Sequence, residues 1–65
     1  MPERTRKLLE ELRAWCDQKH GRRAQVARYV GVEPQVVTNW LAGRQEPTGE
    51  QVLVLLEFMY ARRGR

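Results

Sequence analysis

The sequence has few of the residues on which several classes of protein depend. Its 65 residues include one cysteine and one histidine, so an internal disulfide is excluded and a structural zinc site is not expected. Its longest apolar run covers only residues 52–56, whereas a helix that spans a bilayer needs roughly 20 apolar residues. No apolar segment of the signal-peptide type follows the first residues. We therefore expect a cytoplasmic protein with no membrane partner.

The chain also lacks the length and the residues that catalysis usually requires. A domain of 65 residues buries only about 60% of the surface of its unfolded chain. A substrate pocket of roughly 300–1,000 Å³ does not fit into it easily. No Ser/His/Asp or Cys/His set is present, since His20 stands alone at a predicted helix end. We predict a single domain over residues 1–65 that is not an enzyme, uses no cofactor and binds no small-molecule ligand.

What the sequence does have is positive charge in its middle. Twelve Lys and Arg face eight Asp and Glu, for a net charge of +4. Residues 21–45 carry only arginines as bases, opposed by Glu33, whereas residues 46–60 carry glutamates and no base. Arginine can hold a phosphate with two hydrogen bonds at once. The pattern fits nucleic-acid binding, and a solvated surface that keeps a small protein soluble explains it equally well.

Apolar residues recur at helical spacing between the glycines and prolines, and the alternation typical of strands is absent. The spacing predicts an all-α fold, with helices over about 3–19, 22–30, 34–42 and 48–62. Proline is favoured at the first position of a helix, which suits the one that begins at residue 34. Thr48 and the glutamine three residues later fit a capping box ahead of the last helix.

The helix predicted over 48–62 is apolar around most of its circumference, so it needs more than one partner. One stripe suits the core of the domain: Val52, Leu55, Leu56 and Met59. Other large side chains point elsewhere and are divided between the margin of the core and a homodimer interface: Leu53, Val54, Phe58 and Tyr60.

The spacing of the central segment predicts two helices joined by a sharp turn, a helix-turn-helix over about residues 22–43. Ala27 is small enough to let two helices cross closely, and Gly31 can adopt the positive φ that the turn requires. Apolar side chains then fill the wedge between the helices: Val32, Val37 and Trp40.

With this spacing the sequence resembles the lambda-repressor-like (Cro/cI, or XRE) helix-turn-helix proteins over about residues 21–59. It looks most like the small phage Cro-like and YdaS-type regulators. The resemblance rests on residues 31–44 and on Pro47 with the leucine-rich segment behind it. It implies a compact domain of four to five helices. There are departures, because Glu33 and Pro34 replace residues that family members often use for capping and for base reading.

The resemblance also implies which residues meet DNA, because the second helix of such a motif lies in the major groove. The base-contacting candidates share one short-chained, uncharged helix face: Gln35, Thr38, Asn39 and Ala42. Gln and Asn can pair with adenine, and Thr and Ala can touch a thymine methyl. The phosphate-contacting candidates are Arg22, Arg23, Arg28 and Arg44. A solvated helix face is the alternative for the first set, and a pair with Glu33 is the alternative for Arg28.

The leading hypothesis is a sequence-specific regulator of transcription that binds double-stranded DNA. It would be a repressor of the phage or mobile-element type, binding an inverted repeat as a homodimer. One alternative is a protein-interaction or antitoxin-like module that keeps the fold without binding DNA. Another is a recombination accessory protein, which shares DNA binding but not promoter control.

Overall fold

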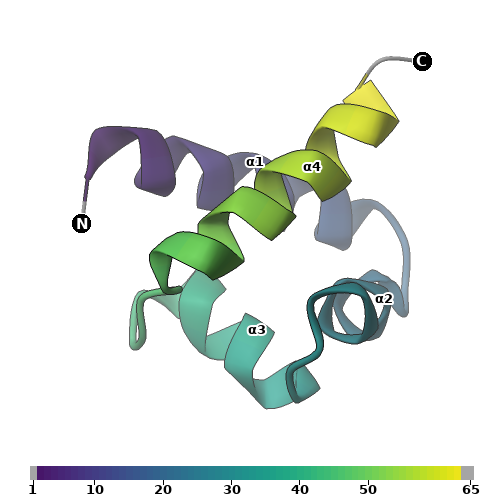
Figure 1. Cartoon of the computed structure of the whole chain (residues 1–65). Helices are drawn as coiled ribbons and strands as arrows, with labels where there is room; N and C mark the ends of the chain where they lie inside the picture. The colour runs from purple at the N-terminus through teal and green to yellow at the C-terminus, as the bar shows by residue number, and fades with distance from the viewer. Residues whose placement is uncertain (1, 64–65) are drawn as a thin grey trace.

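The computed structural model describes residues 2–63, which contain four helices and no strand (Figure 1). In chain order these are α1 (Glu3–Gln18), α2 (Arg22–Val30), α3 (Pro34–Ala42) and α4 (Gly49–Arg63). The prediction of an all-α fold is confirmed, and the predicted boundaries agree within a residue or so. In Figure 1, α4 crosses in front of α1, while α2 and α3 lie side by side below these two helices.

Local chemistry explains where the helices begin and end. Gly31 has φ 90°, and its N–H donates to the carbonyl of Ala27, which ends α2 in the manner expected of glycine. At the start of α4, Thr48 and Gln51 form the predicted capping box. The backbone N–H of Thr48 donates to Oε1 of Gln51 at 2.9 Å, and the N–H of Gln51 donates to Oγ1 of Thr48 at 3.2 Å.

All four helices contribute to one core. Its largest fully buried side chains are Trp40, Phe58, Leu12, Leu55, Val26 and Val37. Ala27 is 2% exposed, so its small side chain lies inside the packing, as the spacing predicted. Trp40 brings a polar atom into this core, because its Nε1 is buried and has no hydrogen-bond partner among residues 2–63.

The structure corrects the assignment of faces on α4. Phe58 was expected partly at a dimer surface, but it is 1% exposed. It packs edge-on against Trp15, with ring centroids 5.2 Å apart. Leu56, which was expected in the core stripe, is 47% exposed instead. The reason is the register of α4, whose inward positions are Leu55, Phe58 and Met59.

Three large apolar residues of α4 point outward, namely Leu53, Leu56 and Tyr60. Leu53 is 62% exposed and Tyr60 is 77% exposed, whereas Val54 is half-buried. At about 100° per residue, positions 53, 56 and 60 fall within about 60° of one another. We call Leu53, Leu56 and Tyr60 the outer stripe of α4.

Cys16 lies in the core, 5% exposed. Burial raises the pKa of its thiol, and the nearby guanidinium of Arg23 only partly opposes this effect. The thiol therefore stays protonated and acts as a small apolar side chain.

Within residues 2–63, no helix is long and apolar enough to cross a membrane. The same residues contain no group of three or more His, Cys, Asp or Glu that could hold a metal ion.

Candidate nucleic-acid interface

The position of α3 follows from its buried side. Val37 is 0% exposed and Trp40 is 1% exposed, so these two residues fix the helix against the core. The opposite side then faces away from the molecule. It carries the four residues predicted to share a face, which we call the outer face of α3: Gln35, Thr38, Asn39 and Ala42.

The four residues differ in exposure across this face. In angular order around the helix they run Thr38, Ala42, Gln35 and Asn39, over about 100°. Gln35 and Ala42 in the middle are exposed, while Thr38 and Asn39 at the two margins are half-buried. Each margin is tied to another part of the chain by a side-chain hydrogen bond.

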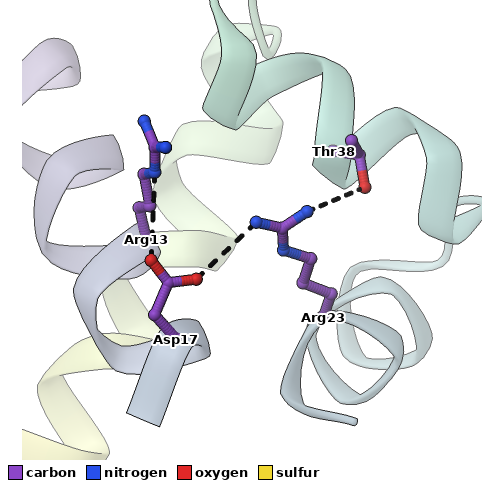
Figure 2. Close-up of polar contacts among 4 residues, drawn as sticks. All are labelled: Arg13, Asp17, Arg23 and Thr38. Carbon is purple, nitrogen blue, oxygen red and sulfur yellow. Dashed lines mark hydrogen bonds and ion pairs between the residues drawn. The ribbon is translucent and has the colours of Figure 1, made fainter. Parts of the chain in front are cut away.

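At the first margin, Arg23 of α2 joins three helices (Figure 2). Its Nη1 donates to Oγ1 of Thr38 at 3.5 Å, and its Nη2 lies 3.7 Å from Oδ1 of Asp17. Asp17 also lies 3.9 Å from Nε of Arg13, one turn earlier in α1. Sequence reasoning missed both α1 residues, although the spacing of four from Arg13 to Asp17 indicated a pair on one helix face.

At the second margin, three amides form a hydrogen-bonded chain. Nε2 of Gln35 donates to Oδ1 of Asn39 at 3.1 Å, and Nδ2 of Asn39 donates to Oε1 of Gln45 at 3.3 Å. We call Gln35, Asn39 and Gln45 the amide chain. Gln45 lies in the connector after α3 and was not predicted as a site residue. Its position depends on Gly43, whose φ of 78° turns the connector back beside the last turn of α3.

The four predicted phosphate-contacting arginines do not share one surface. Arg22 turns toward α1, where its Nη1 donates to the carbonyl of Trp15 at 2.9 Å and to Gln18 at 3.0 Å. Its guanidinium carbon lies 4.2 Å from the centroid of the Trp15 ring. This side chain therefore holds α2 against α1, and the arrangement does not support the predicted phosphate contact.

The other arginines lie closer to solvent. Arg28 is exposed beside a shallow hollow with Tyr29 and Arg62, and no ion pair joins it to Glu33 in the described part of the chain. Arg44 is exposed just beyond the end of α3, where its backbone N–H donates to the carbonyl of Asn39 at 2.9 Å. Arg23 and Arg44 thus lie toward the two margins of the outer face of α3.

A family model for the helix-turn-helix matches residues 9–59. The chain belongs to the helix-turn-helix family. The match covers all of α2 and α3, most of α1, and α4 as far as Met59. It supports the lambda-repressor-like resemblance, while the closeness to Cro-like and YdaS-type regulators stays a prediction. No curated protein and no solved structure matches the chain.

Membership of the helix-turn-helix family assigns a general function. The family is one of DNA-binding domains and is not typically enzymatic, and it supports a DNA-binding regulator of transcription.

Proposed function

We propose that this helix-turn-helix domain is a repressor that binds an inverted-repeat operator as a homodimer, with α3 in the major groove. The observation that carries the proposal is the chemistry of the outer face of α3. None of residues 34–42 is charged, and the side chains of the outer face are short. Such a face can lie close to base edges without the cost of removing water from a charge, and its amides match the groups that bases present.

The proposed contacts divide by chemistry. The residues of the outer face meet the bases: Gln35, Thr38, Asn39 and Ala42. Exposed or half-buried arginines hold the phosphates and supply affinity but no sequence information: Arg23, Arg28 and Arg44. Arg22 is not included, because its guanidinium is already bonded to α1. We expect the protein to act in the cytoplasm.

The outer stripe of α4 supports the homodimer. Leu53 and Tyr60 are more than half exposed, and an apolar groove continues from Leu56 and Tyr60 to Leu8 of α1. A second copy of the chain would cover these surfaces. The proposed interface therefore keeps Leu53 and Tyr60 and takes Leu56 in place of Phe58. Val54 is half-buried and about 100° from Leu53 on the helix, so it is not part of this interface. A symmetric dimer would place two copies of α3 about 34 Å apart on one side of the duplex.

Binding to duplex DNA tests the function. We expect the affinity for an inverted repeat, taken from the DNA upstream of the coding gene, to fall steeply as salt is raised. Gln35→Ala should relax the preference at one or two base pairs. The matched control is Gln25→Ala on the α4 side of α2, which should leave every preference unchanged. Weak salt dependence, with no preference for any duplex, would contradict the proposal.

A protein-interaction or antitoxin-like module is the second candidate, favoured by the apolar outer stripe of α4. It predicts that a partner protein binds this stripe while DNA affinity is absent at all salt concentrations. The same DNA titration therefore separates the two candidates. A recombination accessory protein would share the DNA binding and differ in the genes that lie beside its own.

A further inference from the structure

We propose that Gln45 is a specificity-determining residue. Together with Gln35, it orients the side-chain amide of Asn39 to read an adenine in the major groove and to reject guanine. This inference rests on the proposed function and adds to it the base that is read and a positioning residue outside the helix-turn-helix helices. It is carried by the amide chain, whose two hydrogen bonds both involve Asn39.

The hydrogen-bonding capacity of Asn39 decides which base fits. A side-chain amide has two N–H groups and two lone pairs on its oxygen. In Asn39, one lone pair accepts from Gln35 at 3.1 Å and one N–H donates to Gln45 at 3.3 Å. Among residues 2–63, these bonds leave one N–H and one lone pair for another molecule.

Adenine is the base whose edge complements the free N–H and the free lone pair of Asn39. In the major groove it presents the N6 amino group as a donor beside N7 as an acceptor. The lone pair of Asn39 can accept from N6, and its free N–H can donate to N7. Asn39 would make both hydrogen bonds with one adenine, so this contact would recognise the base itself and not the DNA backbone.

Gln45 supplies the discrimination against guanine. Guanine presents two acceptors, O6 and N7, in the major groove. An asparagine without partners can turn both of its N–H groups toward these acceptors. In the amide chain, one of these N–H groups is bonded to Gln45, so Asn39 cannot satisfy both acceptors of guanine without breaking that bond.

The fold holds the three amides of the amide chain close together, so little conformational entropy is lost when they bond to one another. Gln35 and Asn39 are neighbours on α3 because they are four residues apart. Gly43 reverses the chain, and the N–H of Arg44 donates to the carbonyl of Asn39, which keeps the connector beside the last turn of α3. The two hydrogen bonds of Asn39 orient its amide before DNA arrives, so less side-chain freedom is lost on binding.

The test measures base preference at each position of the operator. Purified wild type is titrated with duplexes that carry A, G, C or T at each base pair in turn. We expect one position with a preference for adenine over guanine on the order of tenfold or more. Asn39→Ala should remove this preference. Gln45→Ala should lower it at the same position by admitting guanine, while Gln45→Glu should retain it because the acceptor oxygen remains.

Gln25→Ala is the matched control and should change nothing, and thermal melting by circular dichroism confirms that each variant is folded. A second measurement needs no DNA. The side-chain amide resonances of Asn39 in a nitrogen–proton correlation spectrum should shift in Gln45→Ala and not in Gln25→Ala.

The outcomes separate the inference from the function on which it rests. Equal weakening of all duplexes by Gln45→Ala would make Gln45 a phosphate contact and would overturn the inference, with the proposed function intact. Unshifted Asn39 amide resonances in Gln45→Ala would overturn it as well. A wild type with no preference for any duplex would overturn both.

Discussion

α3 and α4 each bury one side in the same core, yet they present different chemistry on the side that remains. The outer face of α3 is short-chained and uncharged. At one margin Thr38 accepts a hydrogen bond from Arg23, and at the other Asn39 donates one to Gln45. The outer stripe of α4 is large and apolar, with Tyr60 77% exposed. The difference indicates two kinds of partner. Oriented amides suit the edges of bases, whereas an exposed apolar stripe is suited to another protein surface.

The largest effect on stability should come from a substitution on the side of α4 that faces the core. Phe58→Ala removes a side chain that is 1% exposed, and buried Phe→Ala changes cost about 3–5 kcal/mol of unfolding free energy. The core of so small a domain supplies only about 3–5 kcal/mol in total. We therefore expect Phe58→Ala to be largely unfolded at 25 °C, as measured by urea titration of the helical circular dichroism signal.

The outer stripe provides the control on the same helix. Leu53 is 62% exposed, so Leu53→Asp should change the unfolding free energy by less than about 0.5 kcal/mol at low protein concentration. The same variant should sediment as a monomer at micromolar concentration, where the proposed dimer of the wild type should still be present. A wild type that is monomeric both free and with DNA would contradict the dimer proposed for this stripe.

A loss of stability smaller than that of Phe58→Ala is expected at the turn that positions α3. Gly31 has φ 90°, and no heavy atom of the described residues lies within 4 Å of a Cβ built there. Gly31→Ala should therefore cost only the backbone strain of a left-handed residue, about 1–2 kcal/mol. The measurement is thermal or urea unfolding of the folded variant.

Gly49 at the start of α4 provides the control for Gly31. It also has no heavy atom of the described chain within 4 Å of a Cβ, but its φ is not positive. Gly49→Ala should stabilise the protein by about 0.4–1 kcal/mol, because alanine restricts the unfolded chain. Equal effects at the two glycines would show that the turn before α3 does not depend on the left-handed backbone at Gly31.

The fold was predictable because local signals and periodicity agreed in most segments. Gly31, Pro34 and the capping box of Thr48 mark the same helix ends in the sequence and in the structure. The exception is α4. Leu56 was expected in the core and is exposed, whereas Phe58 was expected partly at a dimer surface and is buried. A helix that is apolar on most sides has no single preferred face, so only its crossing with α1 and α2 decides which residue is buried.

The candidate site was predictable only where it depends on one helix. Spacing alone places Gln35 and Asn39 on one face of α3, and the structure agrees. The partner Gln45 was missed, because its position depends on the backbone of the connector at Gly43. Arg22 and Arg23 look alike in the sequence, but they lie about 100° apart on α2. Which of them reaches α3 depends on how the helices cross.

A small effect on stability is also expected for Arg23 at the margin of the outer face of α3. Its side chain is 42% exposed and its partner Asp17 is 58% exposed, so Arg23→Met should cost only about 0–1 kcal/mol. Its effect on DNA binding should be larger, because the proposed phosphate contact would be lost. The slope of log affinity against log salt should fall by about 1, with the base preferences unchanged. Arg22→Met, one residue earlier, should leave this slope unchanged, because the guanidinium of Arg22 is bonded to α1.

Two outcomes would contradict this prediction. If both variants change the salt slope equally, the assignment of a structural role to Arg22 and a DNA-binding role to Arg23 is wrong. If neither does, α2 takes no part in holding the phosphates.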